Sequence, residues 1–324
     1  MTSKRHLRTR QQLHRHLSYT GWYIRLVQLL KSIHLRHGKA SLYRTCVIFI
    51  DKVGDHHLFE RAYGVAFNFT LSLFPSIIFM FALIPFVHTM IPSISAAETK
   101  VFLEGVLPAS LWEVTESTIN DTLEIRREGL ISFGVLFALF LATNGVNSLM
   151  NSFNVSYKTV ERRSFVKTRF IALFITLLLA TAFILSILLL IVGELVIDWL
   201  LDFTNISTDF INYFVLPLRF VVIMAAFYSA IASIYYWGPA IHDKWRFFSM
   251  GSFLATLLCL ATSFGFSYYI TNFGTYNKLY GSIGGMIGLM VWQYLMSAIL
   301  LLGFEFNASI DRAASSEVYD KEKD

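Results

Sequence analysis

Six long, predominantly apolar stretches constrain the fold of this chain more than any other feature. They lie at approximately 65–88, 130–150, 170–193, 213–236, 247–270 and 281–304. A helix of roughly 20 residues crosses a hydrocarbon core about 30 Å thick, and lipid favours helices because their backbone polar groups are satisfied internally. The sequence therefore predicts an all-α, polytopic membrane protein with about six transmembrane helices.

The composition supports this class. Apolar residues make up 55% of the chain and charged residues 15%, whereas an ordinary soluble domain has about 25% charged residues. The first 20 residues are basic and hydrophilic, unlike a secretory signal with its apolar core. Cys46 lies near this tail and Cys259 inside an apolar stretch, so we expect neither a disulfide nor a zinc site.

Lysine and arginine alternate between the connecting segments. Residues 1–64 contain twelve of them, residues 151–169 contain five, and residues 237–246 contain two. By contrast, residues 194–212 have four acidic residues and no Lys or Arg, and residues 271–280 have only Lys278. Because positive residues are retained in the cytoplasm, we expect both termini to be cytoplasmic.

Two further segments have the pattern of amphipathic helices at the membrane surface. In the first, the apolar face consists of Trp22, Tyr23, Leu26, Val27, Leu30 and Ile33. The second, at 110–125, begins with a capping-box pattern and is expected on the outer surface. The basic N-terminal tail favours anionic lipid headgroups as partners. Nucleic acid is less favoured, since the topology explains the same charges.

We therefore expect three regions along the chain. Residues 1–64 form a basic cytoplasmic tail with amphipathic helices, residues 65–304 a six-helix transmembrane domain, and residues 305–324 a short charged cytoplasmic tail. Pro75 and Pro85 fall inside the first apolar stretch. Because proline removes a helix hydrogen bond, this stretch is expected to be kinked or split.

A row of asparagines follows the second apolar stretch. Asn144, Asn147, Asn151 and Asn154 fall within about 80° of one another on a helix. Asn144 and Asn147 are expected within the membrane, where the burial of a polar amide needs an explanation. Asn151 and Asn154 are expected near the headgroups. The amides either hydrogen-bond neighbouring helices or form the polar wall of a cavity for a solute or lipid headgroup.

Two charged residues are further candidates for such a cavity. Arg219 lies about six residues into the fourth stretch, and ionisable groups within membranes are candidates for function. It pairs with Glu194 or Asp198 on the outer side, binds a solute, or extends its long side chain outward to the headgroups. Glu305 is expected to end the sixth helix, where it either pairs with Arg246 or the basic residues of 151–169, or couples proton movement.

Glycines in the sixth stretch form a packing motif. Gly281, Gly284, Gly285 and Gly288 give two overlapping GxxxG spacings, which allow a neighbouring helix to approach closely. The expected role is helix packing, and a sliding surface for alternating access is the alternative.

Three stretches together resemble one family. They are FNFTLSLFPSI at 67–77, NSFNVSYKTVERRSF at 151–165, and the run from Ser267 to Ala308 that includes YGS and GFEFNA. They resemble the YihY or virulence-factor BrkB family of bacterial inner-membrane proteins, in consistent order over roughly 45–310. Pro239 is followed by Ala240 where the family commonly has a polar residue. The resemblance implies a location in the bacterial inner membrane and supplies an architecture more firmly than an activity.

From the residues and the resemblance we expect a protein that transports or binds a small solute or lipid. A non-catalytic envelope scaffold is the alternative. The sequence has no HExxH, GxSxG or Walker A pattern, so we expect no enzyme, no cofactor and no metal, and we do not carry over the family's former ribonuclease label. The substrate and any coupling ion are unresolved, and an oligomer remains an option.

Overall fold

The computed structural model describes two compact units. Described residues are 21–35, 40–54, 57–90, 137–182, 185, 213, 216–241, 245–272 and 282–321. The smaller unit comprises Met1–His56 and Glu305–Asp324, and the larger comprises His57–Phe304. One long helix, α14 (Ser282–Lys321), contributes residues to both.

The smaller unit is built from short elements packed on the last part of α14. It contains α2 (Gly21–Ser32), the antiparallel pair β1 (His34–Leu35) and β2 (Ala40–Ser41), and α3 (Leu42–Val53). Ser41 caps α3, since its hydroxyl accepts from the Arg44 backbone N–H at 3.4 Å. A small apolar core forms around Ala40, Ile310, Ala313 and Ala314. The predicted amphipathic segment near residue 22 is confirmed as helical.

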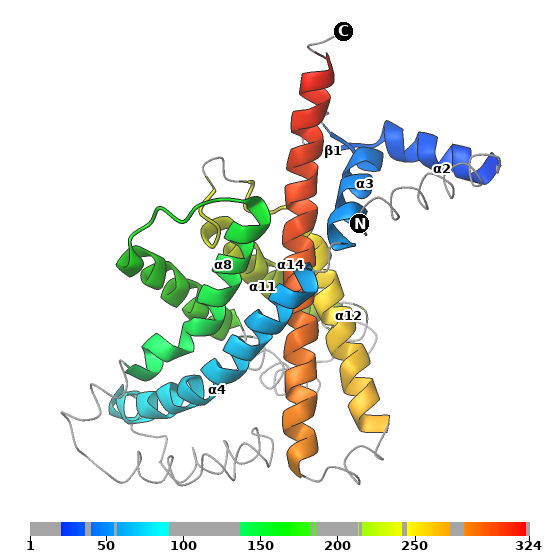
Figure 1. Cartoon of the computed structure of the whole chain (residues 1–324). Coiled ribbons are helices and arrows are strands. Elements are labelled where there is room, and N and C mark those ends of the chain that lie inside the picture. The colour runs from blue at the N-terminus through cyan, green and yellow to red at the C-terminus, as the bar shows by residue number, and fades with distance from the viewer. Residues whose placement is uncertain are drawn as a thin grey trace. The chain divides into compact units, whose positions relative to one another are not determined.

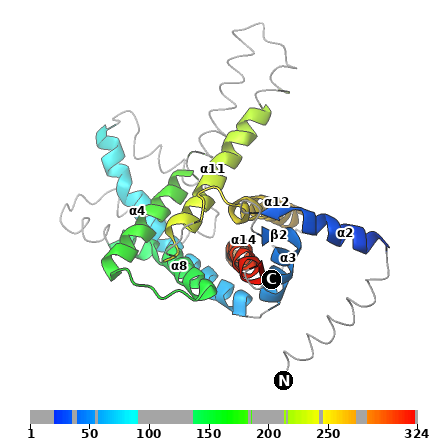
Figure 2. The ribbon, with the colours of Figure 1, turned by 90° about the horizontal axis from the view of Figure 1, so that it is seen from above.

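Long helices make up the larger unit (Figure 1). They are α4 (His57–Met90), α8 (Asn144–Tyr157), α11 (Leu216–Trp237), α12 (Met250–Asn272) and the first part of α14. Residues 137–142 and 165–182 are also helical. α4 packs along α8, and α11 along α12; the neighbouring α4 and α8 are also visible from above in Figure 2. The all-α expectation is confirmed, apart from the two-residue strands.

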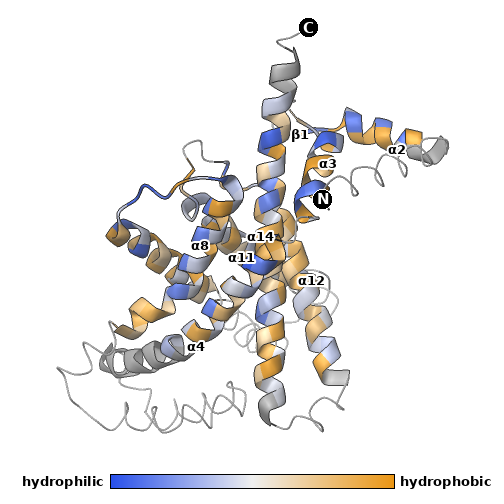
Figure 3. Ribbon diagram, in the orientation of Figure 1, coloured by the Kyte–Doolittle hydropathy of each residue, from blue (hydrophilic) through white to orange (hydrophobic). Residues whose placement is uncertain are grey.

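Four helices among the described residues are long and apolar enough to cross a membrane. They contain Phe165–Ala182, Phe220–Trp237, Met250–Ile270 and Gly284–Ser316. These spans overlap the third to sixth predicted stretches. In Figure 3 apolar residues predominate in the upper part of α12, whereas the connection after α8 is hydrophilic. The predicted surface helix at 110–125 lies outside the described residues.

The first two predicted stretches differ from expectation in their continuity. α4 runs as one helix from His57 to Met90 through both Pro75 and Pro85, so it is not split. The second stretch is instead broken at Thr143, a turn residue between the helical residues 137–142 and α8. Thr143 adopts a helical conformation and its hydroxyl donates to Phe140 O at 2.7 Å.

Aromatic rings form the centre of the larger unit. Phe153 of α8 stacks on Phe304 of α14 at 4.2 Å between ring centroids, and Tyr235 of α11 packs edge-on against both. Next to these rings, Gly303 lets three helices meet. A Cβ atom at Gly303 would lie 2.7 Å from Gly251 O and 2.5 Å from the Tyr235 hydroxyl. Only a residue without a side chain fits this crossing.

The sixth helix continues well beyond its predicted end. We expected it to end at Glu305 and residues 305–324 to form a tail, but α14 continues to Lys321. Phe306, Ile310, Ala313 and Ala314 recur at helical spacing and form the core of the smaller unit. This apolar face explains why the helix persists among charged residues.

Candidate functional site

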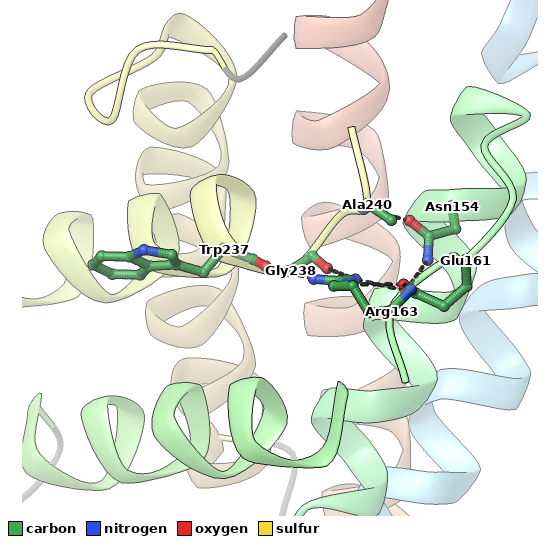
Figure 4. Close-up of polar contacts among 6 residues, drawn as sticks. All are labelled: Asn154, Glu161, Arg163, Trp237, Gly238 and Ala240. Atoms are coloured by element: carbon green, nitrogen blue, oxygen red, sulfur yellow. Dashed lines mark hydrogen bonds and ion pairs between the residues drawn. The ribbon is translucent and has the colours of Figure 1, made fainter. Parts of the chain in front are cut away.

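The connection after α8 is folded around an ion pair. α8 ends at Tyr157, and the C-cap residue Lys158 adopts the left-handed conformation with φ 55°. Downstream of this turn, Arg163 Nε donates to Glu161 Oε1 at 2.7 Å and Nη2 donates to Oε2 at 2.6 Å. The planar guanidinium and the carboxylate therefore form a bidentate pair (Figure 4).

Arg163 also binds the end of α11. Its Nη1 donates to the carbonyl of Trp237 at 3.1 Å, and its Nη2 donates to that of Gly238 at 2.8 Å (Figure 4). The last carbonyls of a helix lack intrahelical donors and carry partial negative charge. The guanidinium therefore caps α11 while it holds the 158–164 connection in place.

Asn154 joins α8 to the same cluster. Its side chain is 5% exposed. The amide donates to Glu161 Oε2 at 2.9 Å, and Oδ1 accepts from the Ala240 backbone N–H at 2.8 Å. We call Asn154, Glu161 and Arg163, with the backbone of 237–240, the α11 latch. Its charged groups engage one another, so the latch is suited to hold two connections together.

The α11 latch predicts a pH-dependent contribution to stability. The pKa of Glu161 lies below its ordinary value of 4.5, mainly because Arg163 hydrogen-bonds the carboxylate, although partial burial opposes this. A lowered folded-state pKa means that the contribution is present above pH 4.5 and is lost as pH falls through the folded value. Wild type should therefore unfold at a higher temperature than Glu161→Gln at neutral pH. The gap should close below pH 4.5, and a gap independent of pH would contradict this assignment.

A second feature is a groove beside Arg169, with a volume of about 240 Å³. Its lining consists of Leu139, Phe140, Thr143, Phe165, Val166, Arg169, Phe170 and Leu173. Arg169 Nη1 donates to Asn144 Oδ1 at 2.7 Å and to Thr143 Oγ1 at 3.2 Å. The guanidinium carbon lies 4.3 Å from the ring centroid of Phe140 and 5.4 Å from that of Phe165. We call this the Arg169 groove; it combines one fixed positive charge with an apolar surface.

A polar seam joins α4 to α8. Asn68 Nδ2 donates to Ser148 Oγ at 3.2 Å, and the Gly145 backbone N–H donates to Ser72 Oγ at 2.9 Å. Further along, Arg61 Nη1 donates to Ser156 Oγ at 2.5 Å. Hydrogen bonds of this kind contribute to helix association in membranes. The seam therefore fixes α8 against α4 through small polar residues.

Comparison with known proteins places the chain in a family. The model of the family described as virulence factor BrkB matches residues 49–324. The chain belongs to the virulence factor BrkB family. This match confirms the resemblance, and it confirms that the chain is an integral membrane protein. Membership in the family assigns no specific activity.

Several bacterial proteins are similar to this chain. A ribonuclease-like protein of Bacillus subtilis, YfkH, is 33% identical over 253 residues, which cover 78% of this chain and 90% of YfkH. A UPF0761 membrane protein of Alteromonas mediterranea is 27% identical over 82% of this chain and 87% of its own length. A UPF0761 membrane protein of Tolumonas auensis is 42% identical over 72 residues, which cover 22% of this chain and 24% of that protein. No solved structure shows significant similarity.

The structure places the four asparagines of this BrkB-family chain in different environments. Asn144 accepts from Arg169, Asn147 is half-buried, and Asn151 is exposed. Asn154 is buried in the α11 latch, although burial was expected only for Asn144 and Asn147; its level near the headgroups stays a prediction. The asparagines share one side of α8, but Asn144 and Asn154 bind separate clusters.

The two charged candidates, Arg219 and Glu305, are not brought together by the described residues. Arg219 belongs to α11, but its side chain lies outside the described part of the chain, as do Glu194 and Asp198. Glu305 is 2% exposed and pairs with Arg312, seven residues further along α14. The predicted pairing with Arg246 or the 151–169 segment is therefore not the one observed.

Among the glycines, Gly288 faces α12. A Cβ there would lie 3.1 Å from the Cδ1 atom of Ile270. Gly284 is buried and Gly285 exposed, whereas Gly281 lies outside the described residues. The two overlapping spacings therefore do not form one uniform contact face.

Sequence reasoning singled out Asn154 but missed its latch partner Glu161 and the serines of the seam. Glu161 stands alone among basic residues, and Ser148, Ser152 and Ser156 recur at four-residue spacing after Gly145. That small-residue spacing is the signal that could have predicted the seam. The latch also accounts for Ala240, because its backbone N–H makes the contact without a polar side chain. Within the described residues, no group of three His, Cys, Asp or Glu could hold a metal.

Proposed function

We propose that this protein binds a membrane lipid or another amphiphilic solute in the Arg169 groove. The observation that carries the proposal is the chemistry of the lining, because six of its eight residues are apolar and one is a fixed cation. An apolar surface with a few oriented polar groups is the usual makeup of a ligand site. The groove is smaller than most drug-sized pockets, so it suits part of a longer ligand rather than a whole solute.

The proposed topology supports an amphiphilic ligand. We propose a multi-pass protein of the bacterial inner membrane with both termini cytoplasmic, based on the distribution of Lys and Arg. In that orientation Arg169 lies one turn inside the span Phe165–Ala182, on its cytoplasmic side. A ligand with its polar end at the inner headgroup level and its apolar part in the bilayer matches this position.

The N-terminal region offers a second contact with lipid. Arg25 and Lys31 lie on α2, which also exposes Ile24 and Leu29. Basic and apolar groups on one helix favour the surface of an anionic membrane. We propose that α2 and the basic tail before it rest on the cytoplasmic leaflet. Loss of vesicle binding by a soluble fusion of residues 1–35 when Arg25 and Lys31 become Gln would support this.

Photo-crosslinking tests whether a lipid occupies the groove. Protein in nanodiscs is exposed to a trace of photoreactive phospholipid, with and without excess unlabelled lipid, and crosslinked peptides are identified. We expect saturable labelling of residues 139–173, which excess lipid suppresses. The lipid-facing surface of α12 around Leu257 and Phe264, both exposed, is the internal control and should label without saturation. Equal, non-saturable labelling of both regions would count against the proposal.

A scaffold in the cell envelope is the second candidate. The polar seam between α4 and α8 favours it, because the hydrogen bonds of the seam join the two helices to each other. Non-saturable labelling at the groove would favour the scaffold hypothesis over lipid binding. Transport of the ligand would further require a second conformation. Labelling of Asn147→Cys by an impermeant thiol reagent from either side, in a chain with Cys46 and Cys259 replaced, would reveal water access to α8.

A further inference from the structure

The charge in the Arg169 groove lacks a counter-ion among the described residues. None of the described residues that line the groove is a carboxylate. The groups that contact the guanidinium are a hydroxyl, an amide and two phenyl rings, all neutral. Arg163 and Arg312, by contrast, each pair with a carboxylate. A partly buried cation is normally paired, because its desolvation is costly, so the groove is suited to an anion from outside the chain.

The donors of Arg169 are only partly used. A guanidinium has five N–H groups, and among the described residues both hydrogen bonds come from Nη1. Within the described part of the chain, the Nε–H and both hydrogens of Nη2 have no acceptor. These donors form the planar edge that binds phosphate or carboxylate oxygens in bidentate geometry. Contacts with Phe140 and Phe165 hold the plane in place, so little side-chain freedom is left to lose on binding.

We propose that the Arg169 groove binds an anionic phospholipid of the membrane. The phosphodiester accepts from the free edge of Arg169, and an acyl chain lies along Leu139, Val166 and Phe170. This inference rests on the proposed function and adds the charge of the ligand to it. A free phosphate ion would meet the same guanidinium, but the apolar remainder of the lining would contribute nothing to its binding. The lining therefore favours a lipid as the source of the anion.

Binding of matched lipids to the purified full-length chain tests this. Phosphatidylglycerol, or diacylglycerol with identical acyl chains and no phosphodiester, is added in equal amounts in detergent, and bound lipid is counted by native mass spectrometry. One bidentate charged contact corresponds to about a tenfold preference. We expect that preference for phosphatidylglycerol in wild type and its loss in Arg169→Gln. Arg162→Gln removes the same charge from an exposed side chain in the connection before this helix and should keep the preference.

A second pair of variants guards against misfolding of Arg169→Gln. Val166→Trp fills the groove while it leaves the contacts of Arg169 in place, and should lose lipid binding to the same extent. Val155→Trp adds the same bulk to an exposed position on α8 and should bind as wild type does. Retention of the lipid preference in Val166→Trp would overturn the proposal, whether or not Arg169→Gln folds.

The outcomes separate this inference from the proposed function. Equal binding of the two lipids, together with saturable crosslinking at the groove, would leave a lipid site and overturn its anionic selectivity. Absence of saturable crosslinking would overturn both. A free-anion site would give a different result with inorganic phosphate. Phosphate would displace phosphatidylglycerol from wild type and would still protect Val166→Trp against thermal unfolding. That result would overturn the lipid assignment.

Discussion

Replacing Gly303 by alanine should destabilise the protein by about 3 kcal/mol, because overpacking a closed helix crossing costs 1–3 kcal/mol and a hydrogen bond is displaced with it. The added Cβ would lie 2.7 Å from both Gly251 O and the Cβ of Ala255. It would also lie 2.5 Å from the Tyr235 hydroxyl, which donates to Leu300 O at 2.7 Å. Two of these neighbours are held by helix backbone, so relief requires α12 or α14 to move. Thermal unfolding in detergent measures the loss.

Gly265 provides the matched control for this change. It lies on α12 and has nothing within 4 Å of an added Cβ, so Gly265→Ala should be neutral or slightly stabilising through helix propensity. Equal effects of the two substitutions would show that helix propensity, and not the crossing, determines the result. Gly288→Ala should lower stability less than Gly303→Ala, because the Ile270 side chain next to Gly288 can give way. The reverse order would also contradict this packing.

The apolar stretches predicted where helices form but not where they end. Segment length and hydropathy indicated the spans that contain residues 165–182, 220–237 and 250–270, because lipid requires them. The charges after Glu305 resembled a solvated tail, yet Phe306, Ile310 and Ala314 already show helical spacing. Helix ends depend on tertiary partners such as α3 and on the Glu305–Arg312 pair. The sequence shows the spacing but not those partners.

The candidate site was less predictable because its contacts join distant segments. Counting Lys and Arg gave a topology, but it could not show that Arg163 would bind the end of α11 while Arg162 stays exposed. The asparagine row drew attention to α8 and included Asn144, which contacts Arg169. Gly303 is not part of a GxxxG spacing in the sequence. Its role is therefore seen only where α11, α12 and α14 cross.

Replacing Arg163 by alanine should destabilise the protein by about 2–4 kcal/mol. The substitution leaves Glu161 without its counter-ion and the carbonyls of Trp237 and Gly238 without donors. Removing one partner of a buried pair costs about 3–5 kcal/mol, and the partial exposure of this pair, 15% and 25%, reduces that figure. Arg162→Ala, which removes an exposed charge next to it, should stay within about 0.5 kcal/mol of wild type.

The double variant Glu161→Ala/Arg163→Ala separates the ion pair from the cap on α11. If the unpaired carboxylate dominates the loss, the double variant should be more stable than Arg163→Ala alone, since no isolated charge remains. If the α11 carbonyls dominate, the double variant should be no better, because they lack donors in both proteins. We expect a coupling energy of about 1–2 kcal/mol between the two residues, within the range for contacting side chains. Additive effects would mean that the bidentate geometry contributes nothing beyond its separate members, and the latch would then be a cap alone.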